Sequence, residues 1–261
     1  MRFTKMHGLG NDYLYVYGEA PDNVSDVCRK LSDRRFGAGS DGMIFISPSR
    51  SADFRMRIFN ADGSEALMCG NGIRCVGKYV YDKGYTDKTR LTVETRSGIR
   101  TLDLNVCAGK VRQASVDMGR AAVKDDIALR PGVVCTPVSV GNPHAVVFTE
   151  DAEAAPLAVL GPEIEHNAAF PGGVNVEFAQ IISRTAIRMR VWERGSGITS
   201  ACGTGACAAA AAAAAKGFCE YLQPIQVRLD GGYLEITVAE DGSVTMLGPA
   251  ETVYEGETAI C

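Results

Sequence analysis

The chain contains the same sequence pattern twice, at positions 133 residues apart. The first copy runs from Arg55-Met56-Arg57-Ile58-Phe59 to Cys69-Gly70-Asn71-Gly72, and the second from Arg188-Met189-Arg190-Val191-Trp192 to Cys202-Gly203-Thr204-Gly205. A period this long is not that of a solenoid, whose units span roughly 20 to 50 residues. It indicates a duplicated domain, so we expect two halves related by a pseudo-two-fold axis, with a cleft between them.

Weaker similarities extend the duplication on the N-terminal side of each cysteine loop. Gly10-Asn11 precedes an apolar run, as does Gly141-Asn142, and Gly39-Ser40-Asp41 is the weaker match of Gly173-Val174-Asn175. The features therefore follow the same order in both halves: a Gly-Asn pair, a strand, a Gly-rich turn, the Arg-Met-Arg strand and the cysteine loop.

Strands are predicted where apolar and polar residues alternate or β-branched residues cluster. These segments are 43–46, 91–94, 101–106, 133–140, 186–191, 225–229 and 233–238. Hairpin turns are predicted at Asp230-Gly231-Gly232 and Glu240-Asp241-Gly242. Helices are predicted at 24–35, 72–83 and 205–216, and a glycine follows each of the last two.

The helix predicted at 205–216 is nearly all alanine before Lys216. It is far shorter than the roughly 20 residues that cross a membrane, and a helix that is apolar on all sides is buried. Small alanine side chains let strands pack closely around it. We therefore predict an α+β fold with two pseudo-symmetric halves, each a curved, mainly antiparallel sheet wrapped around a central helix.

The domain boundary is expected between Gly119 and Pro131, where the sequence becomes charged and then breaks at proline. This places one half at 1–120, carrying Cys69, and the other at 121–249, carrying Cys202. A second break at Gly248-Pro249 suggests that a last strand, within 250–261, crosses back to complete the first half.

Composition excludes several classes of protein. The net charge is −4 and no dense run of Lys or Arg occurs, which argues against nucleic acid or anionic membranes as partners. Nine cysteines without a CxxC pair, and three histidines without ligand spacing, argue against a disulfide framework and a metal site. No apolar signal core follows Met1, so we expect a cytoplasmic protein in a reducing environment.

Most of the cysteines are expected to be small buried hydrophobic residues. These are Cys28, Cys75, Cys107, Cys135, Cys207 and Cys219. Cys69 and Cys202 differ from them because each stands in a Cys-Gly-x-Gly loop that opens a helix. The free N–H groups and the positive dipole end of such a helix favour an anion, so the loop can bind a carboxylate and lower the pKa of the thiol.

Two equivalent thiols on two related halves suggest proton transfer rather than nucleophilic attack. One thiolate can remove the α-proton of an amino acid while the opposite thiol returns a proton to the other face, which inverts the stereocentre. Charge then develops on the substrate carboxylate, where both helix N-termini can stabilise it. Matched halves suit this chemistry because the two enantiomeric arrangements at the reacting carbon are nearly mirror images.

Long motifs in this order resemble those of diaminopimelate epimerase. They are Lys5-Met6-His7-Gly8-Leu9-Gly10-Asn11-Asp12, the stretch Phe59–Cys75, Gly141-Asn142-Pro143-His144 and the stretch Trp192–Ala208. The resemblance implies an isomerase that interconverts LL- and meso-diaminopimelate for lysine and peptidoglycan synthesis. It also implies a cytoplasmic homodimer that uses no pyridoxal phosphate or other cofactor.

The resemblance further implies roles for individual residues. Cys69 and Cys202 would be the acid–base pair, with His144 beside the reacting centre and Glu193 at the substrate ammonium. Backbone N–H groups of Gly70, Asn71, Gly203 and Thr204 would hold the reacting carboxylate. The residues implied to bind mainly the distal end of the substrate are Asn11, Asn60, Asn142, Asn175 and Arg194. Many members of the family carry a substrate-side Gln where this chain has Gly42.

Several alternatives remain open at this stage. Taken singly, the asparagines could only shape turns, and His144 could be a structural histidine. A proline or hydroxyproline racemase could use the same two thiols, although Glu193-Arg194 suits a substrate with a second charged end. A cysteine hydrolase built on Cys69, His144 and an asparagine would leave the second cysteine loop unexplained, and a non-catalytic amino-acid-binding module would not exchange the α-proton.

Overall fold

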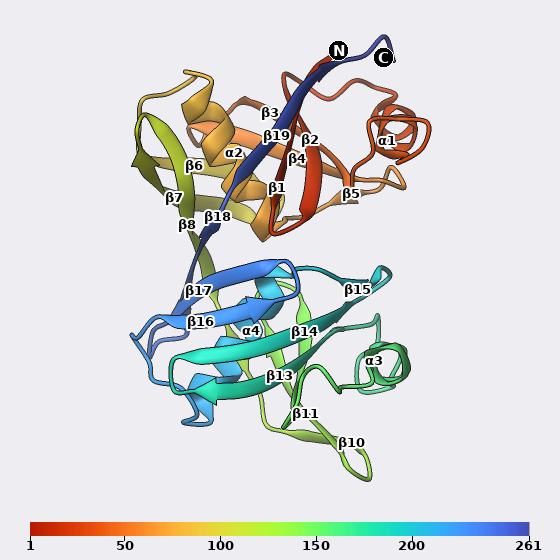
Figure 1. Ribbon diagram of the computed structural model, residues 1–261, viewed down its shortest axis with the longest axis vertical. Helices are drawn as coiled ribbons and strands as arrows, with labels where there is room; N and C mark the ends of the chain where they lie inside the picture. Colours follow the sequence, from red (N-terminus) through yellow and green to blue (C-terminus); the bar gives the residue numbers. More distant parts are fainter. Residues whose placement is uncertain (261) are drawn as a thin grey trace. The chain divides into compact units, whose positions relative to one another are not determined.

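The computed structural model describes residues 1–260, which form two compact units. Unit 1 is Met1–Val116 with the segment from Gly248 onward, and unit 2 is Asp117–Leu247. The chain passes from unit 1 to unit 2 within strand β8 (Lys110–Arg120) and returns within β18 (Ser243–Pro249). Within residues 1–260 each unit contains two helices and its own series of paired strands, and the elements of both are labelled in Figure 1.

The sheet of unit 1 follows the order β19-β1-β2-β3-β4-β6-β7-β8, and the short β5 folds back onto β4. The strands are β1 (Arg2–Gly8), β2 (Asn11–Tyr17), β3 (Gly42–Pro48), β4 (Phe54–Asn60), β5 (Glu65–Ala66), β6 (Arg90–Thr95), β7 (Gly98–Cys107) and β19 (Glu251–Glu257). Among the described residues of this unit, the parallel pairs are β2 with β3 and β4 with β6. A parallel pair needs a long crossover, and helices α1 (Val24–Ser32) and α2 (Gly70–Asp82) lie in these two crossovers.

The sheet of unit 2 follows the order β9-β11-β12-β13-β14-β16-β17-β18. Its strands are β9 (Ala122–Val123), β10 (Ile127–Arg130), β11 (Val133–Ser139), β12 (Pro143–Phe148), β13 (Asn175–Ser183), β14 (Ala186–Glu193), β15 (Gly197–Thr199), β16 (Ile225–Leu229) and β17 (Gly232–Val238). The parallel pairs are β12 with β13 and β14 with β16, which correspond to β2 with β3 and β4 with β6 of unit 1. Helices α3 (Leu157–Glu165) and α4 (Gly203–Ala215) lie in the two crossovers. The same topology in both units confirms the predicted duplication and the α+β fold class.

The central helices are buried by different means. In α4, Ala206 to Ala214 are all buried, and the small side chains allow the helix to contact β9, β11 to β14, β16 and β17. In α2, two buried cations are paired instead: Arg74 donates to the carbonyl oxygens of Gly70 and Pro249, and Lys78 Nζ lies 2.8 Å from a carboxylate oxygen of Asp82. Such pairing offsets the cost of removing a charge from water.

The pairing registers correct one detail of the predicted duplication. Tyr13 of β2 lies opposite Gly42 of β3, and His144 of β12 lies opposite Asn175 of β13. Asn175 is therefore the counterpart of Gly42, and the predicted match of Asn175 with Asp41 is wrong by one residue. The Gly-rich turns carry too little side-chain pattern to fix this alignment, whereas the strand register does.

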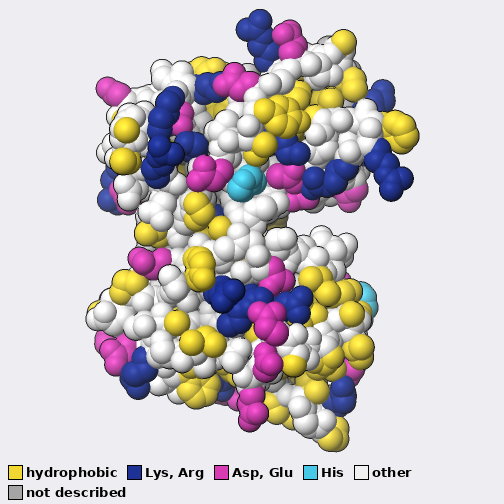
Figure 2. Space-filling model, in the orientation of Figure 1, with side chains coloured by type: hydrophobic (Ala, Val, Ile, Leu, Met, Phe, Trp, Pro, Cys, Tyr) yellow, Lys and Arg dark blue, Asp and Glu magenta, His cyan; other side chains and the backbone are white. Residues whose placement is uncertain are grey.

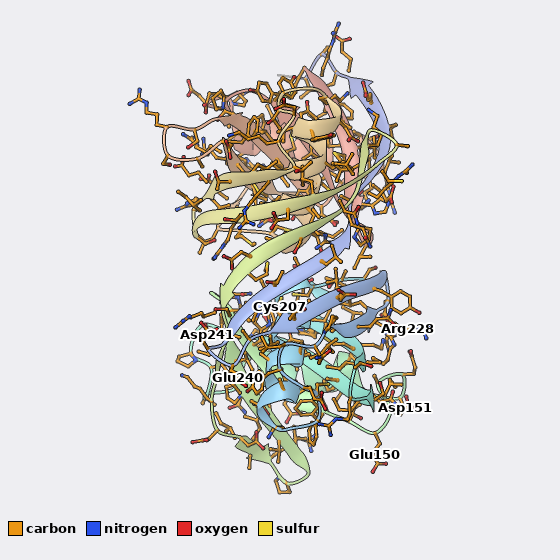
Figure 3. All side chains as sticks on the ribbon, turned by 90° about the vertical axis from the view of Figure 1, so that its left-hand side faces the viewer. Glu150, Asp151, Cys207, Arg228, Glu240 and Asp241 are labelled. Carbon is orange, nitrogen blue, oxygen red and sulfur yellow. The ribbon has the colours of Figure 1, made fainter. Side chains whose placement is uncertain are left out.

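Most predicted segments occur within one or two residues of their positions, and two departures have a local cause. The first helix ends at Ser32 rather than Arg35, because Asp33 Oδ1 accepts hydrogen bonds from the backbone N–H groups of Arg35 and Phe36 and forms a turn there. Helix α3 was not predicted, and it contains Pro162, a residue that argues against a helix. Figure 3 labels Glu240 and Asp241 at the predicted turn between β17 and β18.

All but one of the remaining cysteines among residues 1–260 are buried. Cys28, Cys75, Cys135, Cys207 and Cys219 are buried as predicted, and Cys261 lies outside the described residues. The prediction for Cys107 is wrong: it ends β7 at a tight turn and is exposed.

Acidic and basic side chains are interspersed on the face that Figure 2 presents. Within residues 1–260, none of the helices has the length and apolarity needed to span a membrane.

Candidate active site

Each duplicated cysteine is the N-cap residue of a central helix. Cys69 has φ −137° and ψ 116° before α2, and Cys202 has φ −120° and ψ 110° before α4. The thiol sulfur of Cys69 accepts a hydrogen bond from the N–H of Gly72 at 3.3 Å, and that of Cys202 accepts one from Gly205 at 3.3 Å. The two thiols therefore stand in equivalent backbone frames.

The glycine in the first turn of each helix makes room for a neighbouring strand. A Cβ atom at Gly72 would lie 2.7 Å from Ile44 Cδ1, and one at Gly205 would lie 2.6 Å from Glu177 Oε1. Ile44 and Glu177 occupy equivalent positions on β3 and β13, opposite Tyr15 and Val146. Each helix N-terminus thus carries free N–H groups, a positive dipole end and a thiol, a combination suited to a carboxylate or a developing anion.

A fixed amide faces the thiol of Cys69. The thiol donates to Asn11 Oδ1 at 3.3 Å, and Asn11 Nδ2 donates to Asp41 Oδ2 at 2.8 Å. Asp41 in turn accepts from the N–H of Asp12 and from Arg34. The orientation of the Asn11 amide is therefore set by its partners, and its oxygen points at sulfur.

The ionised groups of unit 1 lie behind this amide rather than beside the thiol. Lys5 Nζ lies 2.9 Å from Asp12 Oδ2, and Arg34 Nη2 lies 2.7 Å from Asp12 Oδ1. Burial raises the pKa of Asp12, but hydrogen bonds from Arg34 and Lys5 outweigh burial and leave the pKa below its ordinary value. Asp12 is thus an ionised anchor that holds the Asn11 segment.

Tyrosines complete the surroundings of Cys69. Burial raises the pKa of Tyr13 well above its ordinary value, and the negative charges of Cys69 and Asp41 add to the shift. Tyr15 is fully buried, and its hydroxyl donates to the carbonyl oxygen of Gly72 at 3.2 Å. Both side chains remain neutral phenols beside Cys69.

Two predicted asparagines of unit 1 have partners within their own loops. Asn60 Nδ2 donates to Ser64 Oγ at 3.1 Å at the end of β4. Asn71 is 2% exposed, and its Oδ1 accepts from Arg74 Nη2 at 3.0 Å. The Asn71 side chain faces the protein interior, which agrees with a role through its backbone N–H rather than its amide.

A chain of hydrogen bonds approaches Cys202 from β12. His144 Nε2 lies 3.1 Å from Asn142 Oδ1, and Asn142 Nδ2 donates to Thr204 Oγ1 at 3.4 Å. Thr204 Oγ1 lies 3.6 Å from the sulfur of Cys202. His144 is buried, and its Nδ1 lies 2.7 Å from Glu177 Oε1.

Burial and two nearby carboxylates determine the electrostatics of Cys202. Burial raises the pKa of this thiol well above its ordinary value, and the negative charges of Glu193 and Glu177 raise it further. Burial also raises the pKa of Glu193, although hydrogen bonds from the Thr199 hydroxyl and the Cys202 thiol oppose the shift. The predicted lowering of the thiol pKa is therefore wrong for Cys202, because the sequence pattern showed the helix N-terminus but neither the burial of the thiol nor these carboxylates.

Asn175 and Arg194 form a separate group in unit 2. Asn175 Oδ1 accepts from the backbone N–H of Arg194 at 2.8 Å, and Arg194 Nη1 donates to the carbonyl oxygen of Gly172 at 3.0 Å. The Arg194 side chain is exposed and packs so closely on Gly173 that a Cβ there would lie 2.8 Å from Arg194 Cδ. An exposed guanidinium anchored in this way can present its remaining N–H groups to a carboxylate.

The structure thus brings some of the predicted residues together with a thiol in each unit, whereas Asn60, Asn175 and Arg194 have other partners. Cys69 meets Asn11 in unit 1, whereas in unit 2 Cys202 meets Glu193 and Thr204, and Thr204 links it to Asn142 and His144. No cluster of three or more His, Cys, Asp or Glu side chains within residues 1–260 could hold a metal ion.

The residues that touch these groups and were not predicted include Tyr13, Asp41, Glu177 and Thr199. Glu177 had a signal in the sequence, since it is the one charged residue in the run from Val174 to Phe178. It also stands two residues after Asn175, and alternate residues of a strand face the same side of the sheet.

The chain also matches known proteins in sequence. The family model for diaminopimelate epimerase matches residues 3–124 and 136–253. The diaminopimelate epimerase of Acetivibrio thermocellus is 50% identical over 276 residues, covering 98% of both chains. That of Methanococcus maripaludis is 47% identical over 279 residues, covering 100% of both chains. These matches confirm the predicted resemblance.

Solved structures with low sequence identity share the fold. A probable proline racemase from Agrobacterium radiobacter is 19% identical with a TM-score of 0.79, and the match covers 100% of this chain and 93% of that one. A phenazine biosynthesis protein of the PhzF family from Bacillus anthracis is 17% identical with a TM-score of 0.80, over 100% and 99% of the two chains. These similarities establish the architecture alone, whereas the sequence matches are far closer. Because of these sequence matches, the chain belongs to the diaminopimelate epimerase family.

Proposed function

We propose that this chain interconverts LL- and meso-diaminopimelate by proton transfer at one α-carbon, without pyridoxal phosphate. The observation that carries the proposal is the pair of cysteine N-caps, which share backbone angles, a glycine N–H donor and the first turn of a buried helix. Membership of the diaminopimelate epimerase family supplies the substrate.

In the proposed reaction, Cys69 and Cys202 act on opposite faces of the α-carbon. A thiolate takes the α-proton, so the C–H bond breaks and an S–H bond forms. The opposite thiol then gives its proton to carbon, and its S–H bond breaks as the new C–H bond forms with inverted configuration. Nothing is oxidised or reduced, and the two thiols have exchanged protonation states, so the reverse reaction can begin from the product.

The helix N-termini stabilise the intermediate in this proposal. Loss of the α-proton moves negative charge onto the substrate carboxylate. The N–H groups of Gly70 and Asn71 in α2, and of Gly203 and Thr204 in α4, are the proposed donors to that charge. Fixed donors aimed at developing charge supply a large part of the rate enhancement in many enzymes.

The distal end of the substrate distinguishes this proposal from that of a racemase for a simpler amino acid. Arg194 is proposed to bind the distal carboxylate, with Asn11, Asn60, Asn142 and Asn175 as further polar contacts. Glu193 is proposed to face the substrate ammonium. Proline has no second charged end for such a set of residues to recognise.

A substrate comparison tests the proposal. Purified protein without added pyridoxal phosphate should convert LL-diaminopimelate to the meso form, and should leave L-proline and L-lysine unchanged. Arg194→Met should raise KM for diaminopimelate about 10- to 100-fold, as expected for loss of a charge-assisted pair. Epimerisation of proline at a comparable rate would instead favour the racemase, and no turnover of either amino acid would favour a binding module.

We also propose that the protein is a cytoplasmic homodimer with no nucleic-acid partner. The interspersed charges in Figure 2 and the net charge of −4 support the last point. Strand β19 pairs with β1 through one of its edges, and Val253 and Tyr254 on it are 52% and 40% exposed, which offers apolar surface to a second copy. Sedimentation should give about twice the chain mass of 27.8 kDa, and a mass of one chain would contradict the dimer.

A further inference from the structure

Glu177 is a fully buried carboxylate for which the proposed mechanism has no use. It lies in β13 between Val176 and Phe178, and its exposed fraction is 0%. Its Oε1 atom lies 2.7 Å from Nδ1 of His144, and both side chains are completely buried. Its Oε2 atom is also buried and has no hydrogen-bond partner within residues 1–260. A group this costly to bury needs a compensating partner, and His144 is that partner.

The carboxylate lies against the helix turn that holds Cys202. A Cβ atom at Gly205 would lie 2.6 Å from Glu177 Oε1, and the N–H of Gly205 donates to the sulfur of Cys202. The positive end of α4 favours a negative charge at this point. Unit 1 has Ile44 in the equivalent position, so the sheet does not require a carboxylate here.

The hydrogen bonds of His144 indicate which of its nitrogens carry protons. Nδ1 faces the Glu177 carboxylate, and Nε2 faces Asn142 Oδ1. An ionised carboxylate can only accept, so Nδ1 carries the proton in its hydrogen bond to Glu177. The hydrogen bond of Nε2 to Asn142 does not fix a second proton, because the Thr204 hydroxyl on the other side of the amide can donate or accept.

We propose that Glu177 is a positioning residue that keeps Nδ1 of His144 protonated and holds the ring against the Asn142–Thr204–Cys202 chain. Glu177 does not touch the substrate in this proposal, and it acts through His144. The consequence for turnover rests on the proposed epimerase function, whereas the protonation of His144 does not.

The groups that face His144 come from several elements. Glu177 is on β13, Glu193 is at the end of β14, Asn142 precedes β12, and Cys202 and Thr204 begin α4. On the other side of β12, β11 contributes the apolar Val138 opposite His144. Among the ionisable members of this set, only Glu177 is within hydrogen-bond distance of Nδ1.

Nitrogen NMR of histidine-labelled protein tests the proposal directly. The chain has three histidines, and His144→Gln would assign the signals of that ring. The wild-type protein should show a proton on Nδ1 of His144. Glu177→Gln should reduce the fraction of rings protonated on Nδ1, because its amide can also donate to that nitrogen, and Glu177→Asp, which keeps the carboxylate, should keep Nδ1 protonated. A wild-type ring without a proton on Nδ1 would overturn the proposal, even if the variants did not fold.

Kinetics separates positioning from a structural role. Glu177→Gln should lower kcat about 10- to 100-fold, the range for partners that orient a functional histidine, with KM changed less than about two-fold, and Glu177→Asp should recover part of kcat. Asp126→Asn is the matched control, because it makes the same chemical change at the other end of α4, where Asp126 binds Lys216. Wild-type kcat in Glu177→Gln, or a lower kcat with the His144 signals unchanged, would overturn the proposal. Wild-type protein inactive on diaminopimelate would refute the proposed function instead, and the NMR result would still decide the role of Glu177.

Discussion

The surroundings of Cys69 and Cys202 share a backbone and differ in charge. Around Cys69 the strands present Tyr13, Ile44 and Asn60, whereas the equivalent positions around Cys202 present His144, Glu177 and Glu193. A tyrosine and two side chains that cannot ionise thus correspond to a histidine and two carboxylates. The duplication preserved the geometry that places a thiol at a helix N-terminus, and the electrostatic tuning of each thiol was left to a few side chains on β2 to β4 and β12 to β14.

The difference is chemically reasonable because the reacting α-carbon of diaminopimelate carries, besides hydrogen, three different groups: a carboxylate, an ammonium and the long side chain. A proton must be removed from either face of the α-carbon, which requires two thiols in matched frames. The rest of diaminopimelate is not symmetric about that carbon, so the side chains around the two thiols need not match.

Loss of either thiol should have the largest effect. Cys69→Ala and Cys202→Ala should each lower kcat by about 10³-fold or more, since general acid–base groups contribute up to roughly 10⁴-fold. Cys107→Ala is the control, because Cys107 is exposed and lies in neither cysteine loop. Steady-state epimerisation assays measure all three. Full activity in one of the two active-site variants would show that a single thiol is sufficient.

Oxidation should couple the two half-sites. If both thiols reach one α-carbon, a mild disulfide-forming oxidant such as oxidised glutathione should join Cys69 to Cys202 and abolish most activity, and dithiothreitol should restore it. Peptide mapping of the oxidised protein identifies the linked pair. Cys202→Ala protein supplies the control for oxidation elsewhere. Full activity after oxidation, with the sulfurs of Cys69 and Cys202 shown to be linked, would contradict their proposed roles.

Replacing Glu193 by asparagine, the residue type of its counterpart Asn60, should make the pKa values of the two thiols more alike. Burial raises the pKa of Cys202 first, and the negative charge of Glu193 raises it further. Glu193→Asn or Glu193→Gln should therefore favour the Cys202 thiolate, so that its alkylation by iodoacetamide begins at lower pH. Epimerisation should fall about 10- to 100-fold, because the proposed contact with the substrate ammonium is lost. An alkylation curve that moved to higher pH would contradict the sign of this electrostatic effect.

The smallest predicted effect concerns the helix glycines. Replacing a helical glycine by alanine often stabilises a protein, but Gly72→Ala and Gly205→Ala should each destabilise this one by about 1 to 3 kcal/mol through overpacking. Gly205→Ala should cost more, since its Cβ displaces the buried Glu177–His144 pair, whereas that of Gly72 displaces only the end of Ile44. Urea unfolding followed by circular dichroism measures the difference. If Gly205→Ala lost no more unfolding free energy than Gly72→Ala, the Glu177–His144 pair would adjust as easily as the Ile44 side chain.

The sequence predicted those features that depend on local pattern. The apolar run before Lys216 predicted a buried central helix, and α4 is that helix. The cysteine loops predicted two helix N-termini, and Cys69 and Cys202 are the N-caps of α2 and α4. The domain limits at 1–120 and 121–249 stay a prediction, which limited proteolysis would test.

Features that depend on long-range packing were not predicted. The match of Gly42 with Asn175 follows from parallel strand registers, which the intervening turns do not encode. A Cβ at Gly42 would lie 2.0 Å from the carbonyl oxygen of Phe59, so this backbone leaves no room for the Gln that many family members carry there. The role of Glu177 depends on its contact with His144, 33 residues earlier in the chain, and a strand pattern alone marks it only as an anomaly.

The most direct test of two thiols acting on opposite faces measures deuterium at the α-carbon of product and recovered substrate after reaction in D2O. Wild-type protein is incubated with LL-diaminopimelate, and the reaction is stopped after a few per cent conversion. We predict that nearly every meso product molecule carries one solvent deuteron at the inverted α-carbon, while recovered LL-diaminopimelate retains its protons. Meso product that keeps the original proton would mean that one group removes and returns it, and would contradict the two-thiol mechanism.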